Sequence, residues 1–386
     1  MKPLAGYVVI DHGEFITAPY TAMLLGDLGA EVIKVERPNG GDRFRSFERG
    51  LYGPQFTAFN KNKQSIVLDL DDAADRDVMH DLLRRADVYV NNLRPGAADR
   101  LGFGVDAVRA INPSIVYCAI SGFGPAGPYA QRPAYDTVGQ ALSGFLSMFV
   151  SPEAPRIAGP ATADSVSGLY AACGILAALL ARRDGAPPPD VHVPMVAAMA
   201  HFSIEQYHRY FATNDVPGPS DRPRVSLSFA LRCRDGKLLA IHLSSPAKFW
   251  DGFIKAIDRP ELAADARFAT RMDRVNNHET LREVLQPVFL QRDRDEWVER
   301  LAAADVPHAP ILNLDEALDD PQMKALALER TVSHATEGAV RTLRSPILFN
   351  GDRDDADMSA PPALDEHGTA IRARLNPSDS ADKEKR

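Results

Sequence analysis

The stretch that decides the fold is residues 7–36, which read YVVIDHGEFITAPYTAMLLGDLGAEVIKVE. Residues 7–10 form a run of aromatic and β-branched side chains that is typical of a buried strand. Residues 18–28 carry apolar side chains at helical spacing, and residues 31–35 are a second strand-like run. A strand, a helix and a strand in this order predict a βαβ unit with two parallel strands.

The same alternation continues on the C-terminal side of this unit. We predict strands at 65–68, 88–90 and 115–120, separated by helices at 73–85 and 105–111. Such a pattern indicates a parallel sheet with helices on both faces and ligands at the carboxyl ends of the strands. The sequence therefore predicts an α/β fold with a Rossmann-like parallel sheet.

The length of 386 residues exceeds what one hydrophobic core usually supports, so we expect two domains. After a linker rich in proline, a predicted hairpin at 224–244 and helices at 249–303 indicate a smaller α+β domain. The expected parts are the first section of a large domain at 1–212, the linker at 213–223, the small domain at 224–305, a return to the large domain at 306–375, and a disordered tail at 376–386.

Composition narrows the class of protein. Lys and Arg number 44 against 52 Asp and Glu, a net charge of −8 that argues against nucleic acid as the main partner. Cys118, Cys173 and Cys233 are widely spaced, which favours free thiols in a reducing compartment. The N-terminus lacks a signal-peptide pattern, and the longest apolar stretch, 168–181, is shorter than the ~18 residues that span a bilayer. We expect a cytoplasmic protein without a membrane partner.

Several common sites are excluded by their missing motifs. Residues 11–19 read DHGEFITAP and lack the GxGxxG turn that lets a pyrophosphate approach the backbone. No P-loop, GxSxG or HExxH motif occurs. His201, Glu205 and His208 fall near one face of a predicted helix, but no further ligand accompanies them. We interpret them as packing residues and predict no metal site.

Residues 159–170, GPATADSVSGLY, open the most apolar helix of the chain, which we predict to run to Gly185. Asp164 falls at or beside its N-cap. It either caps the helix, or it is a nucleophile that the helix dipole keeps ionised for attack on a thioester. Residue type and position do not decide between these interpretations.

Further motifs lie along the chain in a fixed order: DHGEFITAP at 11–19, GDLGAEVIKVE at 26–36, FNKNKQSI at 59–66, NLRPG at 92–96, LG at 101–102, SGFGPAGPY at 121–129, PAYD at 133–136 and QALSG at 140–144. In this order they resemble the class III CoA transferases, a family that includes formyl-CoA and carnitine CoA transferases and alpha-methylacyl-CoA racemase. Asp164, in the pattern Ala-Asp-x-x-x-Gly, falls on the family's catalytic aspartate.

The resemblance implies a CoA transferase with acyl-CoA as substrate and no metal. Asp164 would attack the donor acyl-CoA to give a mixed anhydride, the CoA thiolate would then form an aspartyl-CoA thioester, and an acceptor carboxylate would reverse the sequence. The resemblance also implies an interlocked homodimer. Which acyl-CoA and which carboxylate are used does not follow from these motifs.

The resemblance carries a set of CoA contacts onto this chain. Arg37 and Arg100 are predicted to hold the nucleotide phosphates, because guanidinium groups pair well with phosphate, and Lys63 is a weaker candidate. The full set is Ile16, Thr17, Arg37, Leu68, Asp71, Asn92, Leu93, Arg94 and Arg100.

Tyr135 bears on which branch of the family the chain resembles. The racemase has a histidine at this position, and a tyrosine with a pKa of ~10 is a poor base near neutral pH. This difference favours transfer, with Tyr135 orienting the thioester. A glycine-rich loop of some transferases has no counterpart in residues 224–244, where only Gly236 occurs. The alternatives are a 2-methylacyl-CoA racemase or epimerase and a non-catalytic CoA-binding protein.

Overall fold

The computed structural model describes residues 2–48, 50–183 and 187–375. Its contacts divide the chain into two compact units. The first unit comprises Met1–Leu146, Ile157–His208 and Ala327–Arg386, and the second comprises Ser147–Arg156 and Arg209–Leu326. The predicted tail at 376–386 and the predicted helix stop at Gly185 lie outside the described residues.

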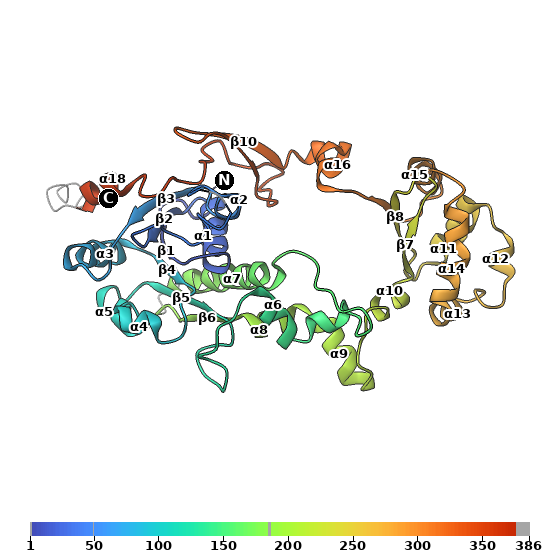
Figure 1. Cartoon of the computed structure of the whole chain (residues 1–386), viewed down its shortest axis with the longest axis horizontal. Coiled ribbons are helices and arrows are strands. Elements are labelled where there is room, and N and C mark those ends of the chain that lie inside the picture. Colours follow the sequence, from blue (N-terminus) through green and yellow to red (C-terminus); the bar gives the residue numbers. More distant parts are fainter. Residues whose placement is uncertain (1, 49, 184–186, 376–386) are drawn as a thin grey trace. The chain divides into compact units, whose positions relative to one another are not determined.

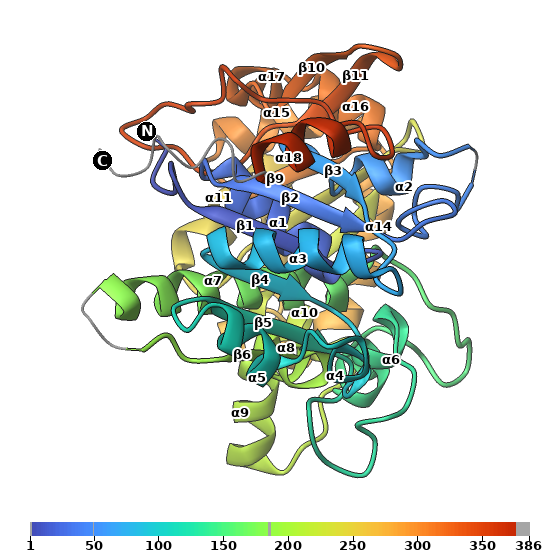
Figure 2. The ribbon, with the colours of Figure 1, turned by 90° about the vertical axis from the view of Figure 1, so that its left-hand side faces the viewer.

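The first unit is built on a six-stranded sheet in the order β3-β2-β1-β4-β5-β6, in which every neighbouring pair is parallel (Figures 1 and 2). This confirms the predicted α/β class and parallel sheet. The strands are β1 (Val8–His12), β2 (Glu31–Glu36), β3 (Lys63–Val67), β4 (Val88–Asn91), β5 (Val116–Ser121) and β6 (Val191–Pro194).

Helices cover both faces of this sheet, because successive side chains of each strand point to opposite faces. Val9 of β1 belongs to one apolar cluster and the next residue, Ile10, to the other. The first cluster is covered by α1 (Thr17–Asp27), α7 (Thr162–Arg183) and α8 (Met195–Phe202). The second is covered by α3 (Ala73–Arg85), α5 (Val105–Ile111) and α18 (Gly368–Leu375), as Figure 2 shows for α3 and α18.

The helices α1 and α7 approach closely at Gly168. A Cβ at Gly168 would lie 2.9 Å from a ring carbon of Tyr20 and 3.2 Å from the carbonyl oxygen of Thr17. The single hydroxyl hydrogen of Thr21 is shared between the carbonyl oxygens of Thr17, 2.8 Å from Oγ1, and Gly168, 3.2 Å from it. The glycine of the Ala-Asp-x-x-x-Gly pattern therefore lets α7 lie against the first turn of α1, one helical turn after Asp164.

Among the described residues, α7 is the one helix that is long and apolar enough to cross a membrane. Half of its most apolar window is buried inside the protein, and Ala171, Ile175 and Leu179 belong to the first core cluster. Since the core helix of a globular protein has the same composition, this helix is explained by packing against the sheet.

The second unit contains an antiparallel sheet in the order β7-β8-β9, packed against helices. Its strands are β7 (Ser228–Arg232), β8 (Leu238–His242) and β9 (His308–Ile311), so the hairpin expected at 224–244 is present. The larger helices are α11 (Ala247–Ile257), α14 (His278–Phe289) and α15 (Arg294–Ala303), and the shorter ones are α10 (Asp221–Ser226), α12 (Glu261–Ala264), α13 (Arg271–Asn276), α16 (Leu314–Asp319) and α17 (Pro321–Leu326).

The chain returns to the first unit later than the sequence predicts. The return was expected at residue 306, but β9 pairs with β8 through Leu239 and Pro310 and remains in the second unit, which ends at Leu326. A strand pattern does not identify the partner of the strand, so the return to the first unit was placed too early in the sequence. The predicted linker 213–223 contains the end of α9 (Ile204–Thr213) and the start of α10.

The remaining elements of the first unit are short. The returning chain forms an antiparallel pair, β10 (Glu329–His334) and β11 (Gly338–Leu343). The others are α2 (Pro54–Thr57), α4 (Ala97–Leu101) and α6 (Asp136–Leu142), and a 3-10 turn covers Phe145–Met148 at the boundary with the second unit.

Candidate active site

A pocket of about 300 Å³ lies in the first unit where β1, β4 and β5 end. Residues that follow these three strands line it, together with the first turn of α7, as the carboxyl-end rule for parallel sheets predicts. The lining residues are Glu14, Phe15, Ile16, Thr17, Arg43, Asn92, Leu93, Arg94, Ala97, Arg100, Ile120, Ser121, Gly122, Pro133, Ala134, Tyr135, Asp164 and Met195.

This pocket brings together most of the residues singled out from the sequence: Ile16, Thr17, Asn92, Leu93, Arg94, Arg100, Tyr135 and Asp164. Three others do not line it. Leu68 is 1% exposed and packs in the second core cluster, and Asp71 lies in the turn after β3. The Arg37 guanidinium pairs with Glu14 at 3.2 Å and donates to the carbonyl oxygen of Gly41 at 2.9 Å.

Asp164 occupies the third position of α7, and a different residue provides the cap. Asp136 Oδ1, at the start of α6, accepts hydrogen bonds from the N–H groups of Ala163 at 2.7 Å and Asp164 at 3.3 Å. Asp136 Oδ2 in turn accepts from Gln140 Nε2 at 2.5 Å. Of the two interpretations left open by the sequence, capping by Asp164 is not what the structure shows, because a carboxylate distant in sequence satisfies those N–H groups.

The Asp164 carboxyl is half-buried, and this environment changes its acidity. Burial raises the pKa of Asp164 to about 7, and the charge of Asp136 adds to the rise. The helix dipole was expected to keep the group ionised, but removal from water and a neighbouring like charge outweigh the dipole. Near neutral pH the group is present both as a carboxylic acid and as a poorly solvated carboxylate.

Tyr135 directly precedes α6 and its side chain is 61% exposed. Its ring contacts the edge of Phe15, with ring centroids 5.7 Å apart. Of the described residues that line the pocket, none is a histidine. The nearby His12 lies outside the lining, with its Nδ1 2.7 Å from the hydroxyl of Tyr89, and burial lowers the pKa of His12 to about 4.

The loop between β1 and α1 is fixed by polar side chains beneath it. Asn92 Oδ1 accepts from the N–H of Glu14 at 3.1 Å, while Asn92 Nδ2 donates to the Glu14 carbonyl at 2.7 Å and to Thr17 Oγ1 at 2.9 Å. Asn92, predicted as a CoA contact, thus holds the loop that forms the pocket wall. Lys63 Nζ is buried 2.8 Å from Asp11 Oδ2, so the weaker phosphate candidate stabilises this loop from inside.

Positive charge gathers on one side of the pocket. Arg94 and Arg100 are exposed, and neither forms an ion pair with another residue in the described part of the chain. The first turn of α1 begins at the same pocket without an acidic side chain or a side-chain cap, so its N–H groups add to the positive potential. Glu14 and Arg43 also line the pocket but were not predicted, although Glu14 lies within the motif at 11–19 and Arg43 follows the motif at 26–36.

The described residues contain no group of three or more His, Cys, Asp or Glu that could hold a metal ion. His201 Nδ1 lies 2.6 Å from the hydroxyl of Tyr170, so His201 joins α8 to α7.

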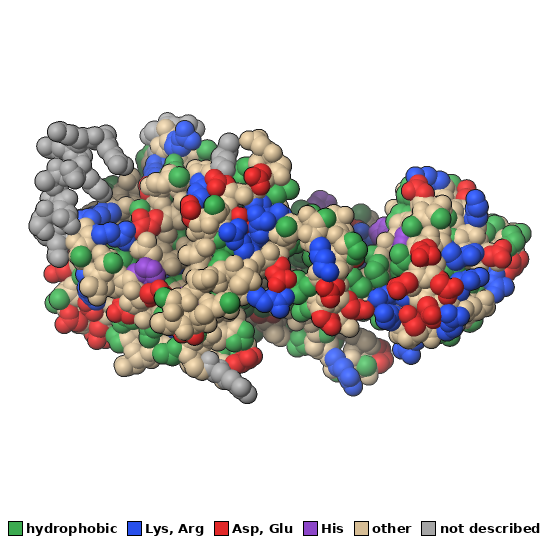
Figure 3. Space-filling view, turned by 90° about the horizontal axis from the view of Figure 1, so that it is seen from above, with side chains coloured by type: hydrophobic (Ala, Val, Ile, Leu, Met, Phe, Trp, Pro, Cys, Tyr) green, Lys and Arg blue, Asp and Glu red, His purple; other side chains and the backbone are tan. Residues whose placement is uncertain are grey.

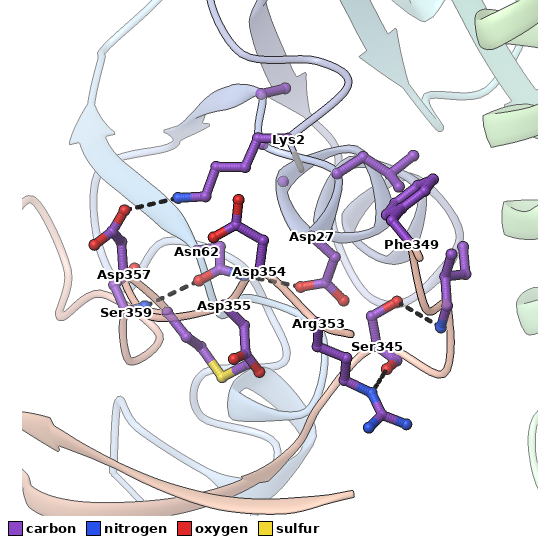
Figure 4. A pocket seen from close by; sticks show the side chains of 16 residues that line it. Lys2, Asp27, Asn62, Ser345, Phe349, Arg353, Asp354, Asp355, Asp357 and Ser359 are labelled. Carbon is purple, nitrogen blue, oxygen red and sulfur yellow. Dashed lines mark hydrogen bonds and ion pairs between the residues drawn. The ribbon is translucent and has the colours of Figure 1, made fainter. Parts of the chain in front are cut away.

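A second pocket, of about 170 Å³, is lined by several acidic side chains (Figure 4). Lys2 Nζ lies 2.8 Å from Asp357, and Asp27 accepts hydrogen bonds from Lys61 and from Asn62 Nδ2. These carboxylates have partners within the first unit, and the lining of this pocket is acidic where that of the first pocket carries Arg94 and Arg100.

Comparisons with known proteins agree with the motifs. The model of "CoA-transferase family III" matches residues 4–368. Acetyl-CoA:oxalate CoA-transferase of Acetobacter aceti is 33% identical over 96% of this chain and 95% of its own length. Succinyl-CoA:glutarate CoA-transferase of Homo sapiens is 30% identical over 96% of this chain and 85% of its own length.

Solved structures extend the agreement to the fold. The crystal structure of a CAIB/BAIF family protein from Brucella suis superimposes with a TM-score of 0.83 and 32% identity, covering 97% of this chain and 99% of the other. The resemblance read from the motifs is confirmed, and the chain belongs to CoA-transferase family III.

Proposed function

We propose that this protein transfers CoA from an acyl-CoA to a small carboxylic acid, with Asp164 as the covalent relay. The observation that carries the proposal is the half-buried Asp164 carboxyl, which shares one pocket with the guanidinium groups of Arg94 and Arg100, to which no described residue supplies an acidic partner. The substrates in the names of the relatives, acetyl-CoA with oxalate and succinyl-CoA with glutarate, support the same reaction class.

The relay begins with attack of the Asp164 carboxylate on the carbonyl carbon of the thioester. The carbon–sulfur bond breaks, CoA leaves as the thiolate, and the acyl group remains on Asp164 as a mixed anhydride. The thiolate then attacks the aspartyl carbonyl, which releases the donor acid and leaves CoA on Asp164 as a thioester. An acceptor carboxylate runs the two steps in reverse, so no water or proton is consumed overall.

Burial of Asp164 supports this role in two ways. A carboxylate taken partly out of water is a stronger nucleophile than a hydrated one, and a pKa of about 7 leaves a substantial ionised fraction at neutral pH. The same exclusion of water protects an anhydride from hydrolysis.

For CoA we assign the phosphates to Arg100 and Arg94, with the first turn of α1 near Ile16 and Thr17 as a further anion-binding element. Arg37 belongs to this set only after release from Glu14, which it contacts at 3.2 Å. The backbone at Leu68 and Asp71 follows β3 and remains a proposed contact for the adenine end of CoA. Tyr135 is proposed to orient the thioester through its hydroxyl.

The test is to mix the protein with acetyl-CoA or succinyl-CoA and with oxalate, glutarate or acetate, and to follow the CoA esters by chromatography. A new CoA ester of the added acid is the expected result. Deuterium uptake from heavy water at the α-carbon of a 2-methylacyl-CoA, without transfer, would instead establish a racemase. Binding of CoA with neither reaction would establish a non-catalytic binding protein, and both of these results contradict the proposal.

We further infer an interlocked homodimer. The chain passes from the first unit to the second and back again twice, and α7 leaves Leu169 and Leu180 more than half exposed in the single chain. Such apolar exposure favours a covered interface. Sedimentation at micromolar concentration should give a dimer, and a folded monomer would contradict the inference.

We also expect the protein to act in the cytoplasm without a nucleic-acid partner. Its three cysteines are free thiols, as in reducing compartments. In the face shown in Figure 3, Lys and Arg side chains are mixed with Asp and Glu, whereas nucleic-acid binding favours a continuous basic surface. Fractionation of the source cells should recover the protein in the cytosol, and recovery with membranes would contradict this expectation.

A further inference from the structure

Phe15, in the wall of the candidate active site, has an unusual backbone conformation. Its φ of 65° lies in the left-handed region, and it is the one aromatic side chain among the described non-glycine residues with positive φ. This region costs an L-residue on the order of 1–2 kcal/mol, and such strain persists only where the surrounding structure holds it in place.

The group that holds Phe15 is the carboxylate of Asp42. Asp42 Oδ1 accepts hydrogen bonds from the N–H of Phe15 at 3.0 Å and from the N–H of Phe44 at 2.9 Å. Asp42 is 1% exposed, and its Oδ2 lies 2.9 Å from Nζ of Lys34, which is fully buried. Lys34 Nζ also donates to the carbonyl oxygen of Gly13 at 2.8 Å, so the loop is anchored on both sides of Phe15.

The ring of Phe15 is fixed as firmly as its backbone. It packs edge-to-face against Phe44, with centroids 5.2 Å apart at 86°, and against Tyr135, with centroids 5.7 Å apart at 83°. Such pairs contribute about 0.5–1.5 kcal/mol each beyond the area they bury. If the ring turned out of the pocket, it would lose its contacts with Phe44 and Tyr135. If the backbone moved instead, the hydrogen bond to Asp42 would be lost.

We propose that Phe15 limits the length of the acyl group bound beside Asp164, and that Asp42 is the positioning residue that holds Phe15 there. The proposal rests on the proposed function. A volume of about 300 Å³ is at the lower end of the roughly 300–1,000 Å³ of ligand pockets, and Phe15, Tyr135 and Asp164 share it. An acyl chain attached at Asp164 therefore meets a wall that cannot move aside.

The experiment measures binding, so that it does not depend on turnover. In an Asp164→Asn background, calorimetry gives the Kd values of acetyl-, butyryl-, hexanoyl- and octanoyl-CoA. Phe15→Gly removes the ring, while glycine keeps the left-handed turn without strain. Phe15→Leu is the matched control, because it keeps apolar bulk at the same place.

For Phe15→Gly we expect the Kd of octanoyl-CoA to fall at least about tenfold relative to that of acetyl-CoA, since a pocket distinguishes methylene groups by factors of this size. Phe15→Leu should keep the ratio within about threefold of the parent. If Phe15 served only to stabilise the fold, Phe15→Gly would raise the Kd values of all four thioesters by the same factor.

Asp42 is tested through its effect on Phe15. Asp42→Asn keeps an oxygen for the two N–H groups but loses the charge that pairs with Lys34. Asp42 is absent from the pocket lining, so a change in chain-length preference must act through the loop. We expect the octanoyl-to-acetyl Kd ratio to fall at least about threefold, and to change no further when Phe15→Gly is already present.

An unchanged ratio in Phe15→Gly, or equal weakening of all thioesters, would overturn the proposal and leave the transferase assignment standing. A further shift on adding Asp42→Asn to Phe15→Gly would overturn the role of Asp42. If Asp42→Asn does not fold, the Phe15 pair alone decides. Failure of every thioester to bind the parent would contradict the proposed function and this inference with it.

Discussion

The carboxylate of Asp136 caps the first turn of α7, the turn that carries Asp164. Asp136 Oδ1 accepts the N–H of Asp164 at 3.3 Å, and its charge contributes to the raised pKa of the Asp164 carboxyl. Asp136 therefore positions the proposed nucleophile and adds to the rise in its pKa that burial causes.

Replacing Asp136 by asparagine separates these two effects. Asparagine caps nearly as well but carries no charge, so the pKa of Asp164 should fall. We expect the acid limb of the pH profile of kcat/KM for CoA transfer to move to lower pH by up to about one unit. Asp136→Ala also loses the cap and should cost about 0.5–2 kcal/mol of stability. An acid limb that stays in place in Asp136→Asn would show that the Asp136 charge does not act on Asp164.

The raised pKa of Asp164 predicts a pH-dependent cost to folding. The folded state holds the Asp164 proton up to about pH 7, whereas the unfolded chain loses it near pH 3.8. The retained proton therefore stabilises the folded state at low pH, and this stabilisation is lost as the pH rises through 7. Asp164→Asn cannot ionise. In urea unfolding, its stability relative to the wild type should rise by about 1–3 kcal/mol between pH 5 and pH 8.

The control for this measurement is Asp319→Asn, at an exposed site on α16 where the side chain is 84% accessible and its ion-pair partner is a lysine, Lys324, rather than a histidine. It should show the same stability difference from the wild type at both pH values. An equal difference at pH 5 and pH 8 for Asp164→Asn would mean that the carboxyl of Asp164 is not buried as described.

Gly168→Ala tests the contact between α1 and α7. The added methyl group would meet the Tyr20 ring and the Thr17 carbonyl, and overpacking of this kind costs about 1–3 kcal/mol. Because both helices begin at the pocket, we also expect a lower kcat for CoA transfer. Cys173→Ala, at an exposed position of the same helix, only shortens a side chain and serves as the comparison. Full activity and wild-type stability in Gly168→Ala would show that the close approach is unnecessary.

Arg100→Gln tests the assignment of the CoA phosphates. Loss of a charge-assisted hydrogen bond of about 1.5–3 kcal/mol should weaken CoA binding roughly 10- to 100-fold, measured by calorimetry, and should weaken the binding of pantetheine, which lacks the nucleotide, much less. Arg84→Gln, on the exposed surface of α3, should leave the CoA affinity unchanged. Equal loss of affinity for CoA and pantetheine would contradict the assignment.

The sequence predicted the parallel sheet because its evidence is local. Alternating strand and helix patterns between residues 7 and 120 allow few other arrangements. The pairing of β9 could not be predicted in this way, because its partner β8 is distant in the sequence. Residues 308–311 have a strand pattern, but only the folded chain shows that they pair with β8. The position of the boundary after 306 was therefore wrong.

In the candidate site too, contacts between residues distant in the sequence could not be predicted. The motifs singled out Asp164, Tyr135 and Arg100, and the structure brings these three residues to one pocket, because family resemblance already contains three-dimensional information. The capping of α7 by Asp136 joins residues 27 and 28 positions apart, and no periodicity indicates it. The direction of the Asp164 pKa was missed for the same reason, since burial depends on neighbours that are distant in the sequence.

The central claim is that Asp164 carries the acyl group and then CoA as covalent intermediates. The direct measurement is to incubate the wild type with acyl-CoA, add borohydride, which reduces an aspartyl thioester to an alcohol, and determine peptide masses after digestion. We predict a modified peptide that contains Asp164, with the altered side chain at that residue, and no modification in Asp164→Asn, which should also lack transferase activity. Modification at another residue, or substantial transfer by Asp164→Asn, would contradict the assignment of Asp164 as the nucleophile.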